Sequence, residues 1–122
     1  MALNRPTAAE LIAAVRAFLE TEVAPQVGGA TLFNVRIAGN VLGIVERELA
    51  LRAPAEAAET ARLVALLGGV GAGARDLARL NRQLVDAIRA GTFDGPAAHR
   101  ALLDHLGATT TDKLAIDNPR YR

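Results

Sequence analysis

The side chains that most often act as nucleophiles are scarce in this sequence of 122 residues. It contains no cysteine and no serine, which excludes thiol chemistry, disulfides and serine nucleophiles and leaves the threonines and Tyr121. Thr7, Thr31 and the threonines at 109–111 stand where helices are expected to begin, so their hydroxyls are expected to cap helices. We therefore predict that the chain is not an enzyme on its own.

The histidines and carboxylates do not have the spacing of a metal site or of an acid–base pair. His99 and His105 are six residues apart, so on a helix they face about 120° away from each other and cannot form the i, i+4 pair of zinc sites. The acids are scattered, and sequence neighbours such as Asp104 and His105 do not converge on a helix surface. We expect no catalytic residues, no metal ion and no cofactor.

A glycine-rich stretch at residues 68–73 has the glycine spacing of a phosphate-binding loop. Such loops follow a strand, but residues 56–67 have the pattern of a helix. Ala74 and Arg75 also occupy the positions where a P-loop requires lysine and a hydroxyl residue. We predict a loop between two helices; a weaker alternative is that free N–H groups at the next helix start hold an anion.

A polar group interrupts the most apolar expected helix, at about residues 31–52. Four residues share an arc of about 60° on that helix: Arg36, Asn40, Gly43 and Arg47. Polar side chains on a central helix need partners, either within the fold or from a bound group. Two interpretations remain open: a shallow notch that receives a carboxylate, a phosphate or a partner's loop, or arginines that pair internally with acids such as Glu22 or Glu48.

The elements that must position these residues are helices, because no segment alternates with the period of two that a strand requires. Expected helices cover about residues 7–23, 31–52, 54–68, 74–90 and 96–107, with a short helix or turn at 111–116. Short connections make neighbouring helices antiparallel. The predicted fold class is all-α: a single domain over residues 1–122, an antiparallel bundle of about five helices with a C-terminal tail at 117–122.

The limits of these helices follow from capping and breaking residues. Thr7 and Glu10 have the spacing of a capping box at the start of the first helix. Pro54 suits the first turn of a helix, whereas Gly91 and Gly107 suit positions just beyond a helix end.

The composition argues against nucleic acid and membrane partners. The formal net charge is +1, and the four aromatic residues are too few for a base-stacking surface. The longest uncharged apolar run is about half of what spanning a bilayer takes, and no signal peptide is recognisable, so we expect a cytoplasmic protein. Thirteen of the fourteen basic residues are arginine, which favours bidentate contacts with carboxylates and phosphates.

Three stretches resemble an uncharacterised bacterial family of small helical proteins: residues 5–11 (RPTAAEL), 35–51 (VRIAGNVLGIVERELAL) and 113–121 (KLAIDNPRY). The family is similar to the accessory protein encoded beside aminoglycoside-phosphotransferase-like kinases and acyl-CoA dehydrogenases, of the levulinate catabolism type. The resemblance implies a non-catalytic subunit of a kinase that phosphorylates a hydroxyacyl-CoA. It supplies no catalytic residues.

We therefore expect an accessory or regulatory subunit of a phosphotransferase-like kinase in acyl-CoA catabolism. The alternative is a self-contained homodimeric helical module that binds an acidic small molecule such as a CoA thioester. In either case the expected contact residues lie on the helix at 31–52 and in the tail: Arg36, Asn40, Gly43, Arg47, Asn118, Arg120 and Tyr121.

Overall fold

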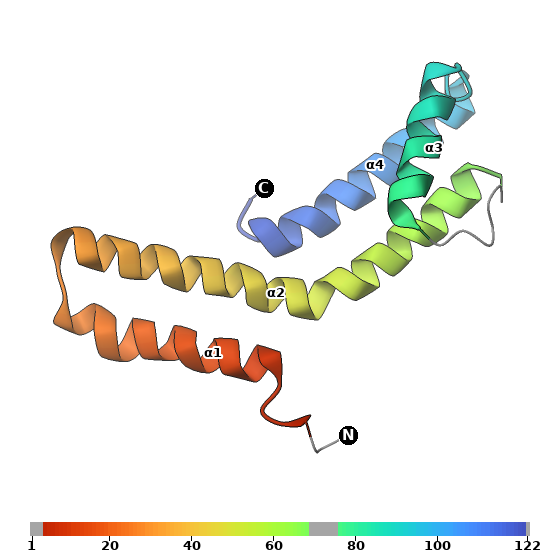
Figure 1. The fold of residues 1–122 in the computed structure, drawn as a ribbon. Coiled ribbons are helices and arrows are strands. Elements are labelled where there is room, and N and C mark those ends of the chain that lie inside the picture. Colours follow the sequence, from red (N-terminus) through yellow and green to blue (C-terminus); the bar gives the residue numbers. More distant parts are fainter. Residues whose placement is uncertain (1–3, 69–75, 122) are drawn as a thin grey trace. The chain divides into compact units, whose positions relative to one another are not determined.

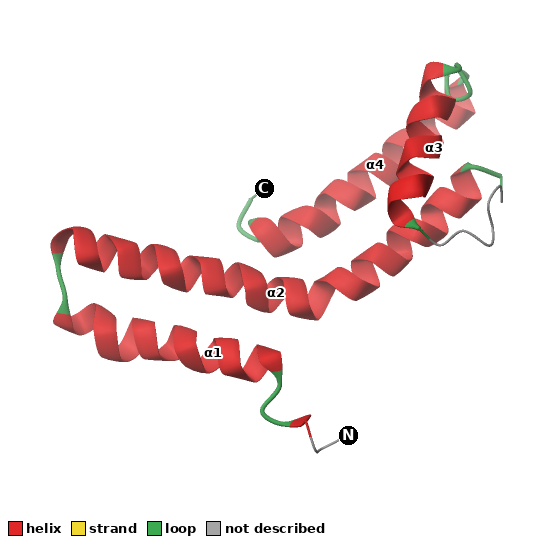
Figure 2. Cartoon of the chain, viewed as in Figure 1, coloured by secondary structure: helices red, strands yellow, loops and turns green. Residues whose placement is uncertain are grey.

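The computed structural model describes residues 4–68 and 76–121, and in this range the chain forms helices and loops without a strand (Figure 2). The prediction of an all-helical protein is confirmed. The helices are α1 (Ala8–Phe18), a π-helical turn (Leu19–Val23), a 3₁₀ turn (Ala24–Gln26), α2 (Gly29–Leu66), α3 (Leu77–Arg89) and α4 (Pro96–Asp117). The described residues thus contain four α-helices, whereas the sequence predicted about five and a short sixth element.

The predicted capping box at the start of α1 is confirmed. The Glu10 N–H donates to Thr7 Oγ1, and the Thr7 N–H donates to the Glu10 carboxylate, each over 3.1 Å. Arg5 adds an ion pair to the same carboxylate at 2.6 Å, and together these hydrogen bonds lower the pKa of Glu10 to about 2. Because the start of α1 is fixed in this way, the positions of its later residues around the helix axis are fixed too, including those that face α2.

The prediction that a helix begins at Pro54 is wrong, because α2 runs through this residue to Leu66. Proline within a helix removes one N–H donor and crowds the preceding turn, at a cost of about 3 kcal/mol. The surrounding residues 53–58 are otherwise four alanines and Glu56, all good helix formers. Thr31 likewise lies within the first turn of α2, not before it.

The prediction of a helix end at Gly107 is also wrong, since α4 continues to Asp117 and includes the threonines at 109–111. Glycine within a helix costs only about 1 kcal/mol relative to alanine. This cost is opposed by contacts on either side of it: His105 is buried, and Thr109 Oγ1 accepts a hydrogen bond from Arg62 Nη2 at 3.0 Å. The expected tail therefore begins after Asp117.

Glycine follows the ends of two helices, as the sequence predicted. Gly68 and Gly91, with φ of +70° and +84°, follow α2 and α3 in the left-handed region that glycine adopts at low cost. α3 begins later than expected, because Asp76 caps it by accepting from the Ala78 N–H at 3.1 Å. Apart from Gly68, the loop predicted at 68–73 lies outside the described residues.

The chain divides into two compact units. Unit 1 is Met1–Arg52 with Ile116–Arg122, and unit 2 is Ala53–Ala115. Unit 2 holds all the buried apolar side chains of the described range: Leu63, Leu80, Leu84, Phe93 and Leu102. In unit 1, α1 lies alongside the first part of α2 (Figure 1), yet Gly39 is the only buried residue among those described there.

A half-buried polar contact joins α2 and α4 within unit 2. Arg62 Nε, on α2, donates to Nδ1 of His105, on α4, at 3.2 Å. This hydrogen bond occupies Nδ1 of His105. Across residues 4–68 and 76–121, no group of three or more histidines and carboxylates could hold a metal ion. Within the same residues, no helix combines the length and apolar character needed to cross a membrane.

Candidate functional site

The polar group predicted on α2 lies in unit 1, where the helix meets the chain after α4. Arg47 Nε donates a hydrogen bond to the carbonyl oxygen of Ile116 at 2.8 Å, across 69 residues of sequence. That carbonyl belongs to the last turn of α4, where backbone carbonyls lack helical partners and a positive charge is favourable. The contact brings the predicted α2 residues and the predicted tail residues to one place.

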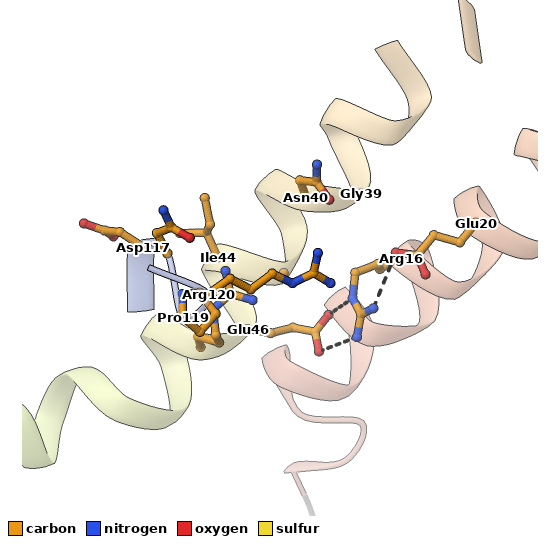
Figure 3. A pocket seen from close by; sticks show the side chains of 12 residues that line it. Arg16, Glu20, Gly39, Asn40, Ile44, Glu46, Asp117, Pro119 and Arg120 are labelled. Carbon is orange, nitrogen blue, oxygen red and sulfur yellow. Dashed lines mark hydrogen bonds and ion pairs between the residues drawn. The ribbon is translucent and has the colours of Figure 1, made fainter. Parts of the chain in front are cut away.

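A polar cavity of about 680 Å³ lies at this junction (Figure 3). Five of the seven predicted contact residues line it: Asn40, Gly43, Arg47, Asn118 and Arg120. The remaining two, Arg36 and Tyr121, are exposed and do not line the cavity. The cavity is therefore built from two sequence segments that were identified separately.

Gly43 allows Arg47 to lie close against the surface of α2. A Cβ atom at position 43 would stand 3.3 Å from Arg47 Nη1, which is tighter than an ordinary contact. The notch predicted at Gly43 is thus occupied in part by the guanidinium of Arg47. Arg47 does not pair with Glu22 or Glu48, the acids considered from the sequence; Glu48 instead pairs with Arg52 at 2.6 Å.

The sequence did not identify the opposite wall, which comes from the first helical segments. Arg16 binds both carboxylate oxygens of Glu46 through Nε and Nη2, the latter at 3.1 Å from Oε2. Arg16 Nη1 also lies 3.4 Å from Glu20 Oε1. The spacing of Arg16 and Glu20 signals a helical ion pair, but Arg16 and Glu46 are 30 residues apart and no local pattern connects them.

The charges around the cavity differ in whether they are already paired. The hydrogen bond from Arg16 lowers the pKa of Glu46, so this carboxylate stays ionised at neutral pH and is a poor proton acceptor or donor there. By contrast, Arg47 and Arg120 form no ion pair with any residue in the described range. Figure 3 shows Asp117 pointing away from the Arg16–Glu46 pair.

This arrangement suits binding of an anionic group. Two guanidinium groups and the side-chain amides of Asn40 and Asn118 supply hydrogen-bond donors around one space. Arginine recognises carboxylates and phosphates through paired N–H groups.

Comparison with known proteins gives one match. A family model described as a domain of unknown function, DUF6285, matches residues 25–121. No curated protein and no solved structure matches the chain. The matched residues include the α2 and tail residues that line the cavity, whereas Arg16 and Glu20 precede them.

Proposed function

Because this chain belongs to the DUF6285 family, a domain of unknown function, we propose its role from the site and from the resemblance of its sequence. It acts as a non-catalytic accessory subunit that binds a phosphotransferase-like kinase of hydroxyacyl-CoA. The observation that carries this proposal is the meeting of α2 and the tail around one polar cavity. The kinase as partner rests on the resemblance of residues 5–11, 35–51 and 113–121.

The cavity offers the partner an anchoring point and not reacting groups. An acidic side chain from a loop of the kinase would meet Arg47 and Arg120, neither of which forms an ion pair with a described residue. Hydrogen bonds to charged groups contribute about 1.5–3 kcal/mol each. A few such contacts would hold the kinase while its own residues carry out phosphoryl transfer.

Co-expression with the phosphotransferase-like kinase encoded nearest to this gene tests the proposal. We expect the two chains to co-elute on size exclusion, and we expect hydroxyacyl-CoA phosphorylation to depend on this chain. A kinase that is fully active alone and forms no complex would overturn the accessory role.

Arg120→Ala is expected to weaken that complex about tenfold or more, the effect of losing one charged hydrogen bond. Arg120 is exposed and its side chain forms no hydrogen bond or ion pair with a described residue, so the helical circular dichroism should not change. Arg47 is a less direct probe, because its Nε also holds the end of α4. Arg100→Ala is the matched control, since Arg100 is an exposed α4 arginine of unit 2. Equal affinity of both variants would place the kinase contact elsewhere.

The unpaired arginines also favour the second candidate, a module that binds an acidic small molecule at the cavity. Free CoA and acetyl-CoA should then raise the Tm of this chain alone, in a saturable manner. Arg120→Ala should reduce that rise, and Arg100→Ala should leave it unchanged. A Tm that does not respond to either compound, or to inorganic phosphate, would exclude this candidate and leave the protein partner.

A further inference from the structure

The side of unit 1 turned away from the cavity is apolar and exposed. α2 carries an unbroken row of apolar side chains spaced by four residues, the α2 ridge: Phe33, Ile37, Val41, Val45 and Leu49. Phe33 is 64% exposed and Val41 51%, and only Val45 is half-buried. Rows of this spacing are the surfaces with which one helix packs into the grooves of another.

Helix geometry places this ridge opposite the cavity. At 100° per residue, the part of the ridge from Val41 to Leu49 lies about 170° around α2 from the cavity-lining residues 40, 43 and 47. α1 adds an apolar stripe of Leu11, Val15 and Phe18, each at least half exposed. The α1 stripe is turned about 150° from Arg16 and Glu20, which line the cavity.

The two apolar rows form one surface. The Arg16–Glu46 pair fixes the register of the antiparallel helices α1 and α2, and the approach of Glu20 to Gly39 agrees with it. This register places the α1 stripe alongside the Val41–Leu49 part of the α2 ridge. Since the α1 stripe and this part of the α2 ridge both lie on the side of the hairpin opposite the cavity, their side chains make a continuous apolar face.

We propose that a second copy of this chain covers this apolar face, so that α1 and the first part of α2 of both copies form a four-helix bundle. Unit 1 has no buried apolar side chain among its described residues, so the two helices alone do not make a core. The side chains of the face, apart from Val45, are about half exposed, from 49% for Leu49 to 56% for Phe18. A standard interface buries roughly 800 Å² per partner, so a second copy would also cover part of the polar margin.

The charge distribution favours a second copy as the occupant. A two-fold interface brings the same surface patch against itself, so any charge near its centre would meet a like charge. The centre of this face, around Val15, Val41 and Val45, is uncharged. The nearest charges on α2 beyond it, Glu48 and Arg52, already form an ion pair at 2.6 Å. An apolar centre with a polar margin is the usual anatomy of such interfaces.

This inference does not depend on the proposed function. A dimer made through the apolar face leaves the cavity of each copy on the outer side of the four-helix bundle. The dimer would therefore present two equivalent cavities, and a kinase that binds at the cavity would form a complex with two copies of each chain.

The test is the mass of the full chain in solution, measured by light scattering on size exclusion and by sedimentation. We expect about twice the chain mass of 12.8 kDa. Val41→Glu places a charge at the centre of the face and should weaken dimerisation about a hundredfold or more. Val85→Glu is the matched control, because Val85 is a similarly exposed valine on α3 of unit 2, and it should remain dimeric.

Circular dichroism shows whether the variants keep their helices, and Val15→Glu, on α1, repeats the test if Val41→Glu unfolds. A wild-type chain that is monomeric at every concentration reached would overturn the proposal. So would a Val41→Glu dimer as stable as that of the wild type. A monomer whose kinase complex is lost in Val41→Glu would identify the kinase, not a second copy, as the occupant of the face.

Discussion

Replacing Leu80 by alanine should lower the stability of unit 2 by about 2–5 kcal/mol, the usual cost of truncating a fully buried leucine. Leu80 lies on α3 and has no exposed surface. It belongs to the small core that includes Leu63 of α2 and Leu102 of α4, so few neighbours are available to fill the space that its side chain leaves. The loss should reduce the protection of α3 and α4 amides in hydrogen exchange.

Val85→Ala provides the comparison for Leu80→Ala on the same helix. Val85 is 44% exposed, so its truncation should change the opening free energy of these amides by less than about 1 kcal/mol. Hydrogen exchange is the suitable measurement because it reports unit 2 separately from unit 1. If Leu80→Ala changed α3 protection no more than Val85→Ala does, the core assigned to unit 2 would be wrong.

Unit 2 should lose stability as the pH falls below about 6.5, because of His105. Burial, and then the nearby charge of Arg62, lower the pKa of His105 below its ordinary value of 6.5, while Glu59 acts weakly in the opposite direction. His105 Nδ1 accepts a hydrogen bond from Arg62, and a protonated ring would present a donor there instead. The folded unit therefore holds a neutral His105.

The sign of the effect follows from proton binding. Between the lowered pKa of the folded state and 6.5, the unfolded chain binds more protons, so the free energy of unfolding rises with pH. The stability that the neutral His105 contributes is fully present above pH 6.5. It is lost as the pH falls from 6.5 through the lowered pKa of the folded state. The carboxylates with lowered pKa, Glu10 and Glu46, act at lower pH, since their ordinary value is 4.5.

Hydrogen exchange of the unit 2 amides, followed in increasing urea at several pH values between 5 and 8, measures how the free energy of unfolding depends on pH. His105→Gln should remove most of the slope, although it also lowers stability at pH 8 through the change in packing. His99→Gln is the control, because it removes an exposed histidine from the same helix. A wild-type stability that does not vary over this range would contradict a neutral, buried His105.

The sequence predicted local features well because they depend on residues close in the chain. The capping box of Thr7 and Glu10 needs only four consecutive residues, and the glycine ends at Gly68 and Gly91 need one residue each. The predictions at Pro54 and Gly107 were wrong because they too used only local preferences. Each has a local preference for a helix boundary, and each preference is outweighed by the surrounding helix formers or by tertiary contacts such as Arg62 with Thr109.

The candidate site was predictable in part. The phase of α2 placed Asn40, Gly43 and Arg47 on one side of the helix, and they do line one cavity. The opposite wall was not predictable, because the pairing of Arg16 with Glu46 depends on how α1 packs against α2. Arg47 and Ile116 are separated by 69 residues of sequence, so no local pattern predicts their contact. This contact brings the tail to the cavity.

The order of the units along the chain has a consequence for biosynthesis. Unit 2 is inserted between the two segments of unit 1, since residues 53–115 separate residues 1–52 from residues 116–122. On the ribosome, all of unit 2 is therefore synthesised before Ile116, whose carbonyl receives Arg47. A chain cut before residue 116 would therefore keep every residue of unit 2 but would lack both the carbonyl that receives Arg47 and the tail wall of the cavity.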